Sequence, residues 1–226
     1  MREGWLLLET SASPRLGVSA DGEVIAVRDL EPGRRHNRDL VPAMQELVRE
    51  SGFTFAELTG IRIGTGPGSY TGLRIGITAA KALAYALDKP LVAVPTYAII
   101  ANRASSELPR LDIIGDALNR TIYVQRFGPM DARTGLRSVL GEVHLEGIAD
   151  YLQGRHAETW IGGPGATTFT TEFPIERCLP LEMRSPDTPT MERIGRTMKP
   201  LNRSEMLALE PLYLRGSSAE EKVKAS

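Results

Sequence analysis

The chain has 226 residues, of which 42% are apolar, and a formal net charge of −1 at neutral pH. Its length suits one large domain or two lobes of about 100 residues each, with enough apolar residues for a proper core. The balanced charge excludes the strongly basic footprint of a protein that grips nucleic acid by itself. The single cysteine, Cys178, excludes an internal disulfide and a zinc site built from cysteines.

The first apolar run, Trp5 to Leu8, is shorter than the ~7-residue core of a signal peptide. No stretch approaches the ~18 apolar residues of a membrane span. We therefore expect a cytoplasmic protein without a membrane partner.

The first half of the chain predicts a hairpin followed by alternating helices and strands. Asp21-Gly22 is a strong hairpin signal, because a tight primed turn requires positive φ. The predicted elements are strands at 5–9, 16–20 and 23–28, a helix at 38–50, a short helix at 54–57, a strand at 60–63, a helix at 72–87, a strand at 91–94 and a helix at 96–105.

The second half repeats this mixture of strands and helices. It predicts strands at 111–116, 121–127, 136–143 and 159–161, helices at 146–152 and 191–198, a Pro-rich loop at 180–189 and a frayed tail at 220–224. The fold class is therefore α/β with two lobes. We place the first lobe at residues 1–107 and the second at 108–226, and leave open that the last residues pack back on the first lobe.

A glycine-rich loop joins the strand at 60–63 to the helix at 72–87. Free N–H groups at a helix N-terminus suit an anion such as phosphate. The loop lacks the lysine of a P-loop and the glycine spacing of the dinucleotide fingerprint, so a ligand loop and a structural turn are equally favoured. The candidate phosphate or nucleotide ligands of the loop are Gly66, Gly68, Ser69, Thr71 and Gly72.

Two carboxylates at strand ends extend this candidate site. Glu9-Thr10-Ser11 ends the first strand and could hold a metal-bound water or a phosphate, or the two hydroxyls could simply satisfy the turn. Asp116 also follows a strand, and with Glu9 and the loop it would make a kinase-like cleft around Mg-ATP. Spacing alone does not bring them together. The three histidines stand singly, without the i, i+4 pair that a helix offers to zinc.

The helix at 72–87 is apolar nearly all round and carries only two charges, Arg74 and Lys81. Such a helix buries more than one face. Its two apolar stripes are Leu73, Ile77, Ala80, Ala84 and Leu87, and Ile75, Ala79, Ala82, Leu83 and Ala86. Either the helix is central in one large domain, or it forms a partner interface with the helix at 38–50. The interface candidates are His36, Leu40, Met44, Leu73, Gly76, Ile77, Ala80, Lys81 and Ala84.

The loop and helix start, Gly66-Pro67-Gly68-Ser69-Tyr70-Thr71-Gly72-Leu73-Arg74-Ile75-Gly76, resemble the signature of the bacterial TsaB (YeaZ) family. Weaker matches are collinear with that family over the whole chain. They are Glu9-Thr10-Ser11, His36-Asn37-Arg38 with Leu40-Val41-Pro42, Val94-Pro95-Thr96, Asp116-Ala117 with Ile122-Tyr123, and Glu210-Pro211-Leu212-Tyr213-Leu214-Arg215.

This resemblance implies the two-lobed actin/Hsp70/sugar-kinase-like fold and a non-catalytic accessory role in tRNA threonylcarbamoyladenosine modification. It implies binding to the TsaD transferase through the helices at 38–50 and 72–87, with the TsaE ATPase as a further partner. Homodimers would use the same helices, and tRNA would be met indirectly. The chain would have no cofactor of its own, with ATP or ADP bound only within the complex.

The chain departs from the family pattern at three positions. Glu9 stands where the family has aspartate, and Asn119 and Thr121 alter the Asp-Ala segment. These changes weigh against nucleotide binding by this chain alone. A stand-alone small-molecule kinase or ATPase of the same fold remains the alternative hypothesis, while the missing His-x-x-x-His motif argues against a peptidase.

Overall fold

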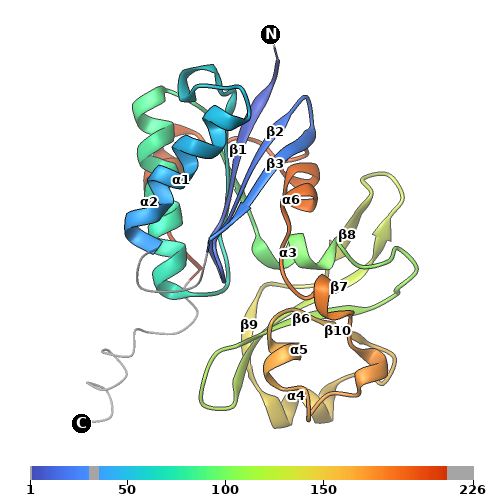
Figure 1. Cartoon of the computed structure of the whole chain (residues 1–226). Coiled ribbons are helices and arrows are strands. Elements are labelled where there is room, and N and C mark those ends of the chain that lie inside the picture. Colours follow the sequence, from blue (N-terminus) through green and yellow to red (C-terminus); the bar gives the residue numbers. More distant parts are fainter. Residues whose placement is uncertain (1, 31–35, 213–226) are drawn as a thin grey trace, which may run out of the picture. The chain divides into compact units, whose positions relative to one another are not determined.

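The computed structural model describes residues 2–30 and 36–212, and these fall into two compact units (Figure 1). The first unit comprises residues up to Arg103 together with Ser185–Pro211. The second comprises Ala104–Arg184 and, among the described residues, Leu212. The charged tail predicted at 220–224 and the end of the Glu210–Arg215 motif lie outside the described residues.

The first unit is built on a five-stranded mixed sheet with the strand order β3-β2-β1-β4-β5. Its strands are β1 (Gly4–Glu9), β2 (Arg15–Ala20), β3 (Glu23–Asp29), β4 (Gly60–Gly64) and β5 (Leu91–Val94). The first three form antiparallel pairs, and β4 pairs parallel with β1 and β5. Asp21 and Gly22 both have positive φ in the β2–β3 turn, as the hairpin signal predicts.

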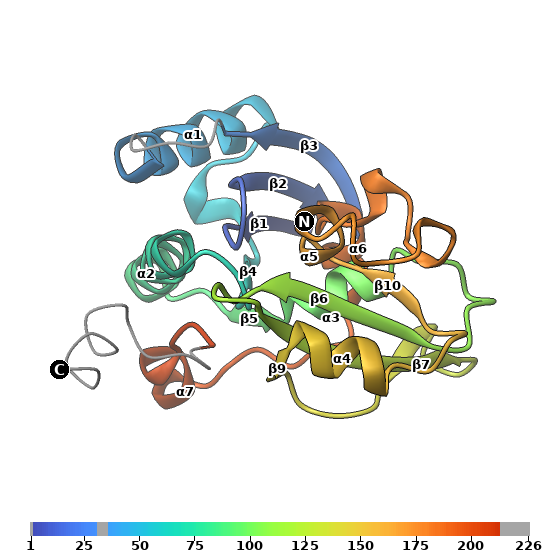
Figure 2. The same cartoon turned by 90° about the horizontal axis from the view of Figure 1, so that it is seen from below.

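Helices α1 (His36–Glu50) and α2 (Tyr70–Leu87) lie next to each other on one face of this sheet (Figure 2). Because successive strand residues point to opposite faces, Leu6, Leu8 and Ile61 pack under these helices. The short α7 (Arg203–Ala208) adds Met206 to the same core. One apolar core therefore holds both long helices to the sheet.

Helix α6 (Thr188–Gly195) covers the opposite face, and α3 (Thr96–Ala101) packs against it. Arg62 of β4 and Glu192 of α6 form an ion pair here, each side chain only 2% exposed. The Arg62 guanidinium lies 3.9 Å from the centre of the Trp5 ring. Ser19 Oγ donates to Glu192 Oε2 at 2.7 Å. A buried ion pair therefore adds to the apolar packing of Met191 and Ile194 in holding α6.

The second unit contains a sheet in the order β10-β6-β7-β8, with β9 also paired to β7. Its strands are β6 (Leu111–Asp116), β7 (Thr121–Asp131), β8 (Leu136–Val139), β9 (His144–Gly147) and β10 (Trp160–Gly162). Ile148 and Tyr151 of α4 (Ile148–Gly154) and Ala166 of α5 (Gly165–Thr168) pack in one apolar cluster with strand residues such as Ile114.

The mixed α/β class is confirmed, and several element predictions need correction. The helix predicted at 96–105 ends at Ala101, and the strand predicted at 136–143 ends at Val139. Residues 144–147 form β9, so the helix expected from 146 begins at Ile148. Helices α5 and α7 were not predicted. The helix predicted at 191–198 is α6, which begins earlier because the Asp187 side chain caps Thr190 N at 2.9 Å.

We predict that Glu192→Gln destabilises the chain by about 3–5 kcal/mol, because the Arg62 charge stays buried without its partner. Urea denaturation measures the loss. The double variant Arg62→Met with Glu192→Leu should lose much less, since apolar residues can replace a buried pair. Equal losses in both variants would show that shape, not charge pairing, fixes α6.

Candidate functional site

The glycine loop between β4 and α2 is closed against the turn that follows β1. A Cβ atom at position 68 would overlap the carbonyl oxygen of Ser11, and one at position 72 would overlap that of Thr10. At position 76 it would overlap the Thr10 side chain. These glycines allow two backbone segments to touch, which is the structural reading of the loop.

Several N–H groups of the loop are already bonded inside the protein. Ser69 N donates to Ser11 O at 2.6 Å, and Gly66 N donates to Thr96 Oγ1 at 3.0 Å. Gly72 N donates to Ser69 Oγ at 3.2 Å, so Ser69 is the N-cap of α2. These three N–H groups therefore serve internal contacts, as the structural-turn interpretation expects, while phosphate binding by the loop stays a prediction. Thr71 is exposed in the first turn of α2.

Glu9 lies at the centre of this closed arrangement, with only 2% of the residue exposed. Its Oε1 accepts from Ser11 N at 2.7 Å, and its Oε2 accepts from the Thr96 hydroxyl at 3.0 Å. A Cβ at position 64 would overlap the carboxylate, so Gly64 makes room for it. Burial raises the pKa of Glu9 above its ordinary value, partly offset by the hydrogen bonds from Ser11 and Thr96.

Thr10, the next residue, is buried beside α2. Its hydroxyl oxygen has no hydrogen-bond partner among the described residues. The hydroxyl neither satisfies the turn nor reaches a loop N–H group. Of the triplet Glu9-Thr10-Ser11, the carboxylate and the Ser11 backbone thus make the contacts that hold the turn.

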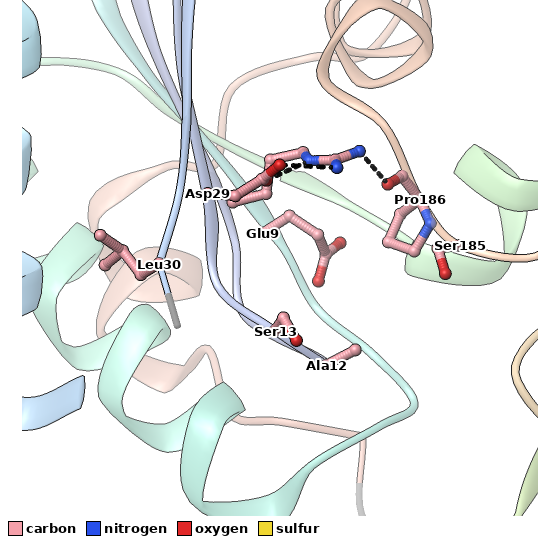
Figure 3. Close-up of a pocket in the computed structure, with 8 residues that line it drawn as sticks. Glu9, Ala12, Ser13, Asp29, Leu30, Ser185 and Pro186 are labelled. Atoms are coloured by element: carbon pink, nitrogen blue, oxygen red, sulfur yellow. Dashed lines mark hydrogen bonds and ion pairs between the residues drawn. The ribbon is translucent and has the colours of Figure 1, made fainter. Parts of the chain in front are cut away.

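A cavity of about 540 Å³ opens beside Glu9 within the first unit (Figure 3). Arg15 lies in its wall and donates to both oxygens of Asp29, from Nε at 2.6 Å and from Nη2 at 3.0 Å. Its Nη1 donates to Pro186 O at 3.3 Å. No sequence motif singles out Arg15 and Asp29, although the hairpin register makes them direct cross-strand partners. The lining residues are Glu9, Ala12, Ser13, Arg15, Asp29, Leu30, Ser185 and Pro186.

Asp116, the second candidate carboxylate, ends β6 in the second unit and is exposed. Its Oδ1 accepts from Leu118 N at 2.7 Å. The following residues Leu118, Asn119 and Arg120 all have positive φ, an unusual run for residues other than glycine. Asp116 therefore shapes the β6–β7 turn. In the part of the chain that the structure describes, no group of three His, Cys, Asp or Glu side chains could hold a metal ion.

Most of the predicted interface residues lie in the core of the first unit. The residues buried against the sheet are Leu40, Met44, Leu73, Gly76, Ile77, Ala80 and Ala84. Lys81 Nζ is bonded to Leu207 O at 2.6 Å and Leu209 O at 3.0 Å. The side chain of His36 lies outside the described residues. The expectation that these buried residues are open to a partner is wrong, because this stripe of α2 packs against the sheet.

A different stripe of α2 faces outward, and we call it the outer face of α2. Its exposed residues are Tyr70, Thr71, Arg74, Thr78, Ala82, Tyr85 and Ala86. Ala82 and Ala86 belong to the second apolar stripe of the sequence, whose other members Ile75, Ala79 and Leu83 are half-buried. The helical period shows two apolar stripes on α2. Which stripe is buried and which is exposed depends on where the sheet lies, and the sequence does not show that.

The family model for tRNA N6-adenosine threonylcarbamoyltransferase, TsaD, matches residues 30–159. The tRNA threonylcarbamoyladenosine biosynthesis protein TsaB of Bacillus subtilis is 40% identical over 120 residues, which are 53% of this chain and 51% of that protein. TsaB of Escherichia coli is 37% identical over 84 residues, 37% of this chain and 36% of that protein. The chain belongs to the family that the TsaD model describes, and it is similar to the TsaB proteins named above. The matched segments span about half the length of these curated relatives, or less.

The solved structure of YeaZ from Pseudomonas aeruginosa matches 94% of this chain and all of its own, with a TM-score of 0.77 at 23% identity. The chain therefore has the fold of YeaZ, as the resemblance to the TsaB family predicts. In the described residues no helix has both the length and the apolar character needed to cross a membrane.

We predict that Glu9→Gln changes the pH dependence of stability. A raised folded-state pKa means that the Glu9 contribution is present below the ordinary pKa and is lost as pH rises through the folded value. The variant lacks this loss, so its stability relative to the wild type should increase as the pH rises above about 4.3, the ordinary pKa of a glutamate. Urea denaturation at a series of pH values above this point measures the slope.

The exposed Glu107→Gln variant controls for the general loss of a carboxylate. Any stability that is lost because the amide of the Glu9→Gln variant bonds to Thr96 less well than the carboxylate does not depend on pH. It therefore does not change the slope of stability against pH. A stability difference between Glu9→Gln and the wild type that stays constant with pH would contradict a raised pKa of Glu9 in the folded chain.

Proposed function

We propose that the chain is a non-catalytic accessory subunit in tRNA threonylcarbamoyladenosine biosynthesis and that it binds the TsaD transferase. Its similarity to curated TsaB proteins, which are named for this biosynthesis, supports the pathway. The observation that carries the binding role is the outer face of α2, an exposed helix surface with the composition of an interface. TsaE joins this assembly in the proposal, and tRNA is met through the partners.

Two tyrosines, each held in place by an arginine, stand at the two ends of this face. Tyr70 is 45% exposed, and Arg74 Nη1 donates to its hydroxyl at 3.0 Å. Tyr85 is 55% exposed, and Arg203 Nη2 of α7 donates to its hydroxyl at 2.9 Å. Each guanidinium also lies over the ring that it contacts, at 5.3 Å and 4.9 Å. Tyrosine and arginine are the residue types that dominate binding energy at interfaces.

Thr78 and Ala82, between the tyrosines, and Ala86, next to Tyr85, are small exposed residues. They would let a partner helix approach α2 closely, because interhelical distance depends on side-chain size at the contact. On the neighbouring α1, Val41 is 47% exposed. An apolar centre with aromatic and arginine ends is the arrangement expected of a helix-binding surface.

The contacts around Glu9 favour an accessory role for this chain over a catalytic one. Its carboxylate is buried and bonded to Ser11 and Thr96, and the loop N–H groups at positions 66, 69 and 72 have internal partners. A phosphate would have to displace these bonds. Nucleotide binding, where it occurs, is therefore proposed for the assembled complex.

We predict that Ala82→Arg weakens binding to the TsaD of the same organism at least about tenfold, since a long charged side chain would stand where a helix must approach. Co-expression followed by size-exclusion chromatography with light scattering detects the complex, and titration calorimetry measures its Kd. Ala82 is exposed, so the variant should fold normally.

Ala132→Arg, in the exposed β7–β8 turn, introduces the same side chain outside the proposed surface and should bind like the wild type. Ala80→Arg is unsuitable, because Ala80 is 0% exposed and the substitution would disrupt the core. A complex that forms equally well with Ala82→Arg would place the interface elsewhere. Failure of the wild-type chain to bind TsaD would remove the proposal.

A further inference from the structure

A second cavity, of about 500 Å³, lies on the α6 side of the first unit, away from the outer face of α2. It is formed by α6, the residues that follow it, and the β2–β3 turn. Its lining residues are Gly22, Glu23, Val24, Pro189, Thr190, Arg193, Arg196 and Thr197. No part of the proposed TsaB role uses this cavity.

The Arg196 side chain packs against the β2–β3 turn, where Gly22 has no side chain to obstruct it. A Cβ on Gly22 would overlap the Arg196 guanidinium, so this glycine serves the arginine as well as the positive φ of the turn. In the part of the chain that the structure describes, the Arg196 guanidinium has no hydrogen bond and no ion pair. Arg15 and Arg28 of the same unit each pair with carboxylates. The cavity therefore holds an arginine that is positioned but unpaired.

Positive charge accumulates around this arginine. Arg193 lies one helical turn before Arg196 and shares the cavity wall, its Nη2 donating to Asn102 O at 2.7 Å. Burial lowers the pKa of Arg62, and the nearby Arg196 charge lowers it further against the opposing effect of Glu192. Among the described lining residues Glu23 is the one acid. Like charges at this spacing repel unless an anion lies between them.

We propose that the cavity binds a phosphate group between Arg193 and Arg196. Guanidinium groups present N–H donors in a planar fork that matches phosphate oxygens, and charge-assisted bonds of this kind are the strong ones. Thr190 and Thr197 place two further polar residues in the wall. The volume leaves room for the remainder of a phosphate ester, so the phosphate belongs either to an RNA backbone or to a small phosphorylated molecule. This site is independent of TsaD binding.

The test uses the full chain with the variant Arg196→Glu and the control Arg133→Glu, which makes the same charge change at an exposed turn. Inorganic phosphate and AMP are titrated by calorimetry and by their effect on Tm. A fluorescein-labelled RNA hairpin is titrated by fluorescence anisotropy at several salt concentrations. Arg196→Lys is included because it keeps the charge and loses the fork.

We expect Arg196→Glu to weaken binding of the effective probe at least about tenfold, Arg133→Glu to match the wild type, and Arg196→Lys to fall between them. Binding of AMP or inorganic phosphate alone would identify a small ligand. Binding of RNA, with a salt slope reduced by about one in Arg196→Glu, would identify a backbone phosphate. No binding of any probe, or equal loss in Arg196→Glu and Arg133→Glu, would overturn the proposal.

Discussion

The buried carboxylate of Glu9 is the constraint on which the centre of the first unit depends. It ends β1, accepts a hydrogen bond from Ser11 in the next turn, and accepts another from Thr96 at the start of α3. Thr96 in turn accepts from Gly66 of the glycine loop. One acid therefore ties together three segments that are far apart in sequence. The cost is its desolvation, which raises its pKa and favours the protonated form.

This constraint explains why the glycine loop is built for contact with its own chain. The carbonyl oxygens of Thr10 and Ser11 occupy the space where Cβ atoms of residues 72 and 68 would be. Glutamate is one methylene longer than the aspartate of the family pattern, and in this chain its carboxylate reaches over Gly64 to Thr96. A loop whose glycines and N–H groups serve internal contacts positions α2 against the turn after β1.

Much of the fold could be predicted from sequence because its strands are short, apolar and separated by clear turn signals. The choice of interface residues failed for a physical reason. Periodicity reveals two apolar stripes on α2, but only the sheet decides that Leu73, Ile77 and Ala80 are the buried stripe. Contacts between distant segments were also beyond reach. The Arg62–Glu192 pair joins residues 130 positions apart, and no local pattern marks either partner.

The two faces of the first sheet carry different kinds of interaction, and this division bears on function. Apolar packing holds α1 and α2 on one face, while on the other face the buried Arg62–Glu192 pair and Ser19 add polar contacts to the packing of α6. At the end of α6, Arg193 and Arg196 line one cavity in which Glu23 is the one acid among the described lining residues. Substitutions at distant sites without shared partners have nearly additive effects. The outer face of α2 and the Arg196 cavity share no residue, so one sheet can support two binding surfaces whose effects are measured separately.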